Sequence, residues 1–176
     1  MTPFPEIRTK RLLLRQIQEK DLDNIFRGLS HPEVIKYYGV NYNSRESTKE
    51  QMTWYRELLE KGTGIWWAIS SLEGDVFYGA AGFNDLQKEH KKAEIGYWLL
   101  PEFWSRGYVS EAVTAILDYA FTSLDLHRIE AYVEVGNENS AKALKKLHFD
   151  YEGRMRDCEI KNGNFISVDL YAKLRD

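Results

Sequence analysis

This chain of 176 residues has one cysteine, no long apolar run and no recognisable targeting segment. Its single cysteine, Cys158, excludes an internal disulfide and any metal site built from several cysteines. No apolar run approaches the roughly 20 residues that a membrane-spanning helix needs. Met1–Glu6 lacks the basic start and the apolar stretch of a secretion signal. We therefore expect a cytoplasmic protein without a membrane span and without a metal.

The chain also lacks the excess of positive charge that nucleic-acid-binding proteins usually carry. Its 24 Lys and Arg residues against 27 Asp and Glu residues give a formal net charge of −3. This balance argues against a nucleic-acid partner. Hydrophobic residues make up 43% and charged residues 29% of the chain, as in a soluble globular domain. Because no repeat, low-complexity tract or linker divides the sequence, residues 1–176 are expected to form one domain.

Hydrophobic patterning predicts both strands and helices. The clearest helix carries an apolar stripe at helical spacing from Val109 to Phe121. Asn162-Gly163 is typical of a two-residue hairpin turn and predicts a closing hairpin. Strands are expected over residues 11–15, 65–69, 76–86, 93–100, 128–135, 149–160 and 165–174. Helices are expected over residues 19–29, 48–59, 109–121 and 139–147, with a short helical turn after Pro32.

This order of elements predicts an α+β fold. Meandering strands followed by a strand–helix–strand unit favour a mixed sheet with helices on its faces. We expect a single domain with a mixed, mostly antiparallel central sheet of about seven strands, flanked by about four helices.

The segment between the strand at 93–100 and the long helix is the most informative for function. It begins at Pro101 and ends in Ser105-Arg106-Gly107. The first N–H groups of a helix have no partner within it, and the helix dipole is positive there. Gly107 lets the backbone approach an anion closely, and Arg106 adds a forked positive donor. The segment suits a phosphate or pyrophosphate, although the same pattern also serves as a plain connection. It is neither a Walker loop nor a dinucleotide-binding fingerprint.

Five segments occur along the chain in a fixed order. They are Thr9–Arg15, Ala93–Leu99, Trp104–Ala112, Asn137–Ala141 with Leu147–Phe149, and Tyr151–Arg154. In this combination they resemble the GNAT acetyltransferases, and within them the RimJ/RimL branch of ribosomal-protein N-terminal acetyltransferases. The resemblance covers nearly the whole chain. Four positions depart from the family pattern: Trp104 and Val109 at the first and last positions of the loop, Leu144 where many members carry a tyrosine general acid, and His148 in place of a glycine. Trp at the first position is familiar in the RimJ/RimL branch.

The resemblance implies an N-acetyltransferase with a GNAT-like fold. Such enzymes transfer an acetyl group from acetyl-CoA, their co-substrate, to a primary amine by direct attack. The likeness to the RimJ/RimL branch favours a protein N-terminal amine as the acceptor. Two alternatives stay open: a small amine, such as a polyamine, an amino-sugar or a toxic amino compound, or a non-catalytic CoA-binding regulatory module. Monomers and homodimers are both common in the family.

The resemblance also implies where acetyl-CoA binds. The loop and the helix start would hold the pyrophosphate through Trp104, Ser105, Arg106, Gly107, Tyr108, Val109 and Ser110. The pantetheine amides would pair, as an added strand does, with the backbone of Trp98, Leu99 and Leu100. The pantetheine arm or the loop beneath it would contact Asn137 and Asn139. The 3′-phosphate would meet Lys142, Lys145 and Lys146, unless these lysines only form the solvated face of a short helix.

Two residues are candidates for proton transfer. Glu94 is the expected general base, which takes a proton from the attacking ammonium group. The alternative for Glu94 is a solvated charge near a hairpin tip. Ser140 is the expected acid because Leu144 has no proton to donate, and its alternative role is a helix cap. The amine acceptor is expected to lie between residues 26–42, Trp54 and the closing hairpin.

Overall fold

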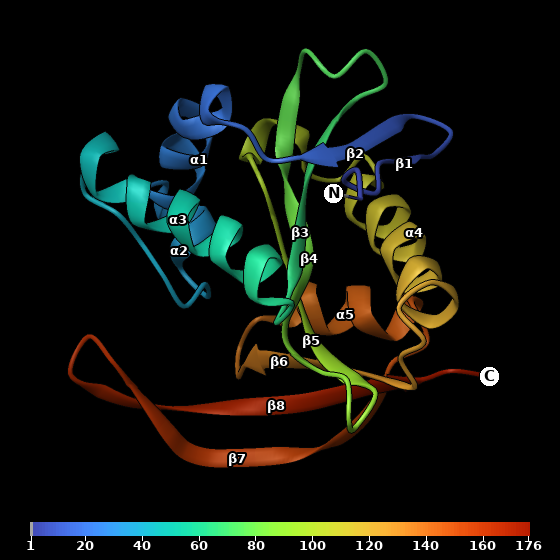
Figure 1. Ribbon diagram of the computed structural model, residues 1–176. Coiled ribbons are helices and arrows are strands. Elements are labelled where there is room, and N and C mark those ends of the chain that lie inside the picture. The colour runs from blue at the N-terminus through green and yellow to red at the C-terminus, as the bar shows by residue number, and fades with distance from the viewer. Residues whose placement is uncertain (1) are drawn as a thin grey trace.

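A mixed sheet of eight strands forms the centre of the computed structural model, which describes residues 2–176 (Figure 1). In spatial order the strands are β1 (Ile7–Arg8), β2 (Leu12–Gln16), β3 (Ile65–Ser71), β4 (Phe77–Gln87), β5 (Lys92–Leu99), β6 (Arg128–Glu134), β8 (Asn164–Leu174) and β7 (Asp150–Lys161). β5 and β6 run parallel, and every other neighbouring pair is antiparallel. The predicted α+β fold with a mixed, mostly antiparallel sheet is confirmed.

Helices cover both faces of the sheet. α1 (Leu22–Leu29), α2 (Pro32–Ile35) and α3 (Arg45–Lys61) lie on one side of β3 and β4 in Figure 1, and α4 (Tyr108–Thr122) lies on the other. α5 (Glu138–Lys146) follows β6. Short 3-10 turns precede α1 and α4, over Glu19–Asp21 (η1) and Pro101–Phe103 (η2). Within residues 2–176, no helix combines the length and the apolar composition needed to cross a membrane.

Each face of the sheet buries its own cluster of apolar side chains. The predicted stripe on α4 is buried from Ala112 to Ala120 and packs with Trp67 of β3 and Leu144 of α5. The neighbouring Trp66 points to the opposite face and packs with α1 and α3. Removal of this apolar surface from water is the main term that stabilises the fold.

Some element boundaries differ from those the sequence predicts. α3 begins at Arg45 rather than at residue 48, because Ser44 and Ser47 form a capping box. α5 begins one residue earlier than expected, because Asn137 caps it. β1 has two residues, too few for a periodic pattern to predict, whereas α2, with four, is the short helical turn expected after Pro32. They bring the described part of the chain to eight strands and five α-helices.

The sheet divides between β5 and β6. These two strands pair only where Lys92–Glu94 lies beside Arg128–Glu130, whereas β4 stays paired with β5 as far as Leu99. From Ile95 onward, β5 therefore has one edge without a strand partner. This split positions the candidate active site.

Candidate active site

Two cavities open along the split between β5 and β6. The first, the β6-side cavity, has a volume of about 500 Å³ and lies between β5, β6, α3 and the segment that joins α2 to α3. The second, the α4-side cavity, has a volume of about 530 Å³ and lies between the end of β5, the start of α4 and α5. Molecules bound in the two cavities would meet at the residues that line both, which are Tyr37, Tyr38, Tyr97, Asn137 and Ser140.

The α4-side cavity reaches the N-terminus of α4. Ser105 and Gly107 have left-handed backbone conformations, with φ of 61° and 79°, and together they turn the chain from η2 into the helix. Gly107 is the N-cap and has no side chain with which to cap the helix. The amides of Tyr108, Val109 and Ser110 therefore have no partner within α4, and all three residues line the cavity. These amides and the positive end of the helix dipole suit phosphate groups.

The open edge of β5 offers backbone groups to the same cavity. The Leu100 amide donates to a carbonyl of β4 at 2.9 Å, and backbone groups alternate in direction along a strand. The backbone groups of Trp98 and Leu100 therefore face β4, while those of Tyr97 and Leu99 face the split. The Leu99 carbonyl already accepts a hydrogen bond from Trp104 Nε1 at 2.9 Å. The register shows that the backbone of Trp98 and Leu100, expected to pair with the pantetheine, is turned toward β4, and that of the expected residues only Leu99 faces the split, together with Tyr97.

Most side chains expected to hold the cofactor line the α4-side cavity, but two do not. Leu100 is fully buried in the core, and the guanidinium of Arg106 lies over the Phe103 ring at 5.7 Å from its centroid. Two of the three lysines on α5, Lys142 and Lys146, line the cavity and the third does not. The expected residues that do line it are Trp98, Leu99, Trp104, Ser105, Gly107, Tyr108, Val109, Ser110, Asn137 and Asn139.

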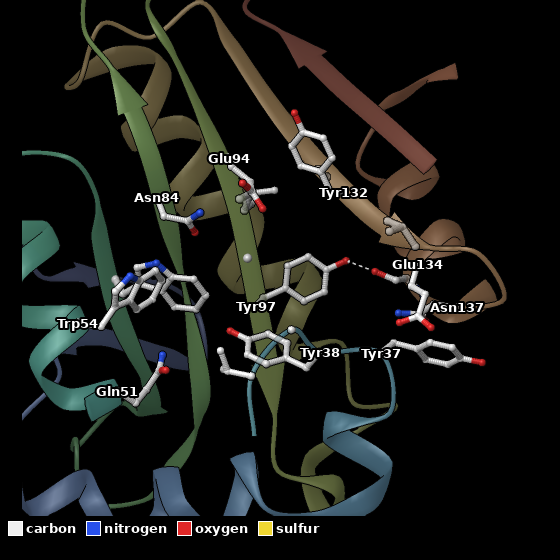
Figure 2. A pocket seen from close by; sticks show the side chains of 18 of the residues that line it. Tyr37, Tyr38, Gln51, Trp54, Asn84, Glu94, Tyr97, Tyr132, Glu134 and Asn137 are labelled. Atoms are coloured by element: carbon white, nitrogen blue, oxygen red, sulfur yellow. Dashed lines mark hydrogen bonds between the residues drawn. The ribbon is translucent and has the colours of Figure 1, made fainter. Parts of the chain in front are cut away.

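Tyr97 and Ser140 form a hydrogen-bonded pair where the two cavities meet. Their hydroxyl oxygens are 2.9 Å apart, and a dashed line leads from Tyr97 in Figure 2. The cap of α5 is Asn137, whose Oδ1 accepts from the Ser140 amide at 3.2 Å, so the alternative role of Ser140 as the cap is wrong. Burial raises the pKa of Tyr97 and the Ser140 hydrogen bond opposes this, so the phenol stays neutral at physiological pH. The sequence patterns did not single out Tyr97.

Glu94 lies in the wall of the β6-side cavity. Figure 2 shows its half-buried carboxyl group between Asn84 on β4 and Tyr132 on β6. Burial raises the pKa of this carboxyl, the charges of Asp85 and Glu130 raise it further, and a hydrogen bond from Asn84 opposes them. Glu94 is therefore not a fully solvated charge at a hairpin tip.

Aromatic and acidic side chains dominate the rest of the β6-side cavity. As expected, residues from the segment 26–42 and Trp54 line it. The closing hairpin lines no part of it, because residues 131–134 of β6 border the split instead. The aromatic lining residues are Tyr37, Tyr38, Tyr42, Trp54, Trp66, Tyr97 and Tyr132. The acidic ones are Glu50, Glu94 and Glu134.

Known proteins share both this sequence and this architecture. The acetyltransferase (GNAT) domain family matches residues 11–150. The chain belongs to the GNAT acetyltransferase family. It is 36% identical over 170 residues to the uncharacterized N-acetyltransferase YoaA of Bacillus subtilis (strain 168), covering 96% of each chain. It is 38% identical over 168 residues to the uncharacterized N-acetyltransferase p20 of Bacillus licheniformis, covering 95% of this chain and 94% of that one. This GNAT protein is therefore an acyl-CoA-dependent N-acetyltransferase.

Solved GNAT structures superpose closely on this enzyme. RimL, a ribosomal L7/L12 alpha-N-protein acetyltransferase in complex with CoA, gives a TM-score of 0.86 at 24% identity and covers 97% of this chain and 98% of its own. Spermidine N-acetyltransferase from Vibrio cholerae, in complex with CoA and spermine, gives 0.83 at 22% identity and covers 94% and 96%. At these identities the likeness establishes the fold. The predicted resemblance to GNAT enzymes of the RimL type is confirmed.

Proposed function

We propose that this enzyme transfers an acetyl group from acetyl-CoA to a primary amine by direct attack at the junction of the two cavities. The observation that carries the proposal is the shared wall at Tyr97, Asn137 and Ser140, because transfer between two substrates requires their reacting groups to meet. In this arrangement acetyl-CoA occupies the α4-side cavity and the amine enters through the β6-side cavity.

In this proposal each group of acetyl-CoA has a place in the α4-side cavity. The free amides of Tyr108–Ser110 would hold the diphosphate at the helix N-terminus. The pantetheine arm would run along the open edge of β5, against the backbone of Tyr97 and Leu99. The thioester would then lie beside Ser140. Lys142 and Lys146 on the α5 wall would attract the charged nucleotide end.

Glu94 is the group we assign to take the proton from the attacking amine, directly or through a water. The free amine then attacks the thioester carbon, so that the C–N bond forms and the C–S bond breaks. The nitrogen's second surplus proton passes to the departing thiolate, which leaves as free CoA thiol. The raised pKa of Glu94 brings its basicity closer to that of an amine, which makes the proton transfer less unfavourable than to a solvated carboxylate.

Ser140 is the group we assign to the departing thiolate. A thiol of pKa about 8.5 is already a fair leaving group, so a hydrogen bond from the Ser140 hydroxyl is sufficient help. The Tyr97 hydroxyl lies 2.9 Å from Ser140 Oγ, so it can donate to Ser140 and keep that hydroxyl oriented while Ser140 donates to the sulfur. Leu144 is fully buried and has no proton to give. In this proposal the Tyr97 phenol on β5 supports the donor in place of the tyrosine that many family members carry on this helix.

For the acceptor we propose a protein N-terminal amine, supported by the likeness to RimL, which acts on an alpha-amino group of ribosomal L7/L12. A second candidate is a small polycationic amine. The carboxylates Glu50 and Glu94 and the tyrosines around them favour it, because both kinds of group attract cations, whereas Glu134 is already paired with Lys161 at 2.8 Å.

Release of free CoA thiol from acetyl-CoA tests both the acetyl transfer and the choice of acceptor. The panel contains short peptides with a free N-terminus, the same peptides with a blocked N-terminus, and spermine. We expect turnover of the free peptides and none of the blocked ones. Turnover of spermine without turnover of any peptide would favour the second candidate. No thiol release with any primary amine would contradict the transfer itself.

A further inference from the structure

The turn between β1 and β2, Thr9–Arg11, contacts the first turn of α4 at Glu111, about a hundred residues away in the chain. The Glu111 carboxylate accepts three hydrogen bonds from this turn: from Thr9 Oγ1 at 2.6 Å, from the Arg11 amide at 2.8 Å and from Arg11 Nε at 2.6 Å. Burial alone would raise the pKa of Glu111, but the hydrogen bonds from Thr9 and Arg11 outweigh burial and lower it. Glu111 is therefore ionised at neutral pH.

Arg11 also fastens the turn that leads into α4. Its Nη1 donates to the Arg106 carbonyl at 2.8 Å, and its guanidinium carbon lies 4.8 Å from the Tyr108 ring centroid. Arg106 is flanked by Ser105 and Gly107, both in the left-handed region. A serine is disfavoured in that region, so contacts from elsewhere must hold the turn in shape. Arg11 supplies such a contact.

The Glu111 carboxylate would repel an anionic ligand at the N-terminus of α4 if its charge were unpaired. Its carboxylate belongs to the same helical turn as the amides of Tyr108–Ser110, which face the α4-side cavity. A free negative charge there would repel a diphosphate. The Arg11 guanidinium, at 2.6 Å from the carboxylate, cancels that charge and leaves the helix N-terminus attractive to anions.

We propose that Thr9–Arg11 is a clamp that holds the diphosphate-binding turn of acetyl-CoA in shape and neutralises Glu111, with Arg11 as a positioning residue. The proposal rests on the proposed placement of acetyl-CoA at the N-terminus of α4. Arg11 does not line the α4-side cavity, so it acts through the Arg106 carbonyl and through Glu111 rather than by touching the cofactor.

Two acetyl donors separate this role from a purely structural one. S-acetyl-pantetheine keeps the thioester arm of acetyl-CoA but lacks the diphosphate. We expect Arg11→Met to raise the KM for acetyl-CoA about tenfold, while the KM values for S-acetyl-pantetheine and for the amine stay the same. In the double variant Arg11→Met/Glu111→Gln, the KM for acetyl-CoA should be only about threefold above wild type, because the unpaired carboxylate is gone.

The hairpin of β7 and β8 provides a matched control. Arg154 pairs with Asp169 at 2.8 Å, and their side chains are 48% and 14% exposed, compared with 43% and 18% for Arg11 and Glu111. Arg154→Met should leave the KM for both donors unchanged. The clamp would be contradicted if Arg11→Met raised the KM for both donors equally, if it raised neither, or if Arg154→Met raised the KM for acetyl-CoA as much. A wild-type enzyme with the same KM for both donors would instead contradict the diphosphate site itself.

Thermal unfolding of each variant shows whether it is folded before its kinetics are compared. If Arg11→Met does not fold, Arg11→Lys keeps the charge but loses the forked donor that reaches both Glu111 and the Arg106 carbonyl. It should raise the KM for acetyl-CoA about threefold and leave that for S-acetyl-pantetheine alone. A folded Arg11→Lys enzyme with an unchanged KM for acetyl-CoA would contradict the clamp.

Discussion

The phenol oxygen of Tyr97 lies 2.9 Å from Ser140 Oγ, although 43 residues separate the two in the chain. The contact exists because β5 and β6 stop pairing after Glu94 and α5 closes the end of the opening. Both residues line both cavities, so this pair is where two bound substrates would meet. Its role can be tested by removal of one hydroxyl at a time.

Ser140→Ala should lower kcat about tenfold to a hundredfold with little change in the KM for acetyl-CoA, because the lost donor acts on charge that develops in the transition state. Tyr97→Phe should lower kcat less, because Tyr97 acts through Ser140. The double variant should be no slower than Ser140→Ala alone. Steady-state thiol release measures all three, and losses that multiply in the double variant would contradict the coupling.

Glu94→Gln should change how activity depends on pH. The wild-type kcat/KM should fall as the pH drops through the raised pKa of Glu94, because a protonated carboxyl cannot act as the base. Glutamine has no such titration, so the variant should lose this acidic limb and about a hundredfold in kcat/KM at neutral pH. The control is Glu57→Gln, an exposed glutamate on α3. An acidic limb that persists in Glu94→Gln would assign the base elsewhere.

The same substitution should stabilise the fold at neutral pH. The native state raises the pKa of Glu94, so it holds the proton more tightly than the unfolded state. Stability from this group is therefore complete below the unfolded pKa and is lost as the pH rises through the native pKa. Calorimetry should find a higher melting temperature for Glu94→Gln than for wild type at pH 7, and the difference should shrink below the unfolded pKa. A lower melting temperature at pH 7 would contradict the burial argument.

Asn137→Ala should destabilise the protein by about 1 kcal/mol, because it removes the side-chain cap of α5. Chemical denaturation measures this loss. Ser140→Ala is the comparison on the same helical turn. It leaves the cap in place and removes a hydroxyl that lines both cavities, where water can replace its hydrogen bond to Tyr97, so it should destabilise the protein less than Asn137→Ala. The opposite ranking of the two variants would return the capping role to Ser140.

Local patterns in the sequence were enough to predict the elements around the cofactor. The stripe from Val109 to Phe121 predicts α4, and Gly107 before it predicts a helix start with free amides. Asn162-Gly163 predicts the hairpin of β7 and β8. Each of these depends on residues that are neighbours in the chain, and so each can be recognised without a structure.

The geometry between elements could not be predicted in the same way. The parting of β5 and β6 after Glu94 follows from how helices and strands pack together, and no local pattern encodes it. Tyr97 was therefore missed, and only the sheet register reveals that its backbone, unlike that of Leu100, faces the split. The contact between Arg11 and Glu111 likewise joins segments that are distant in sequence.

A crystal structure of the enzyme with CoA tests most directly whether the two substrates meet at Tyr97 and Ser140. We predict the CoA sulfur within hydrogen-bonding distance of Ser140 Oγ, with the diphosphate on the amides of Tyr108–Ser110. A sulfur far from both Ser140 and Tyr97, or a diphosphate bound away from the N-terminus of α4, would contradict the account.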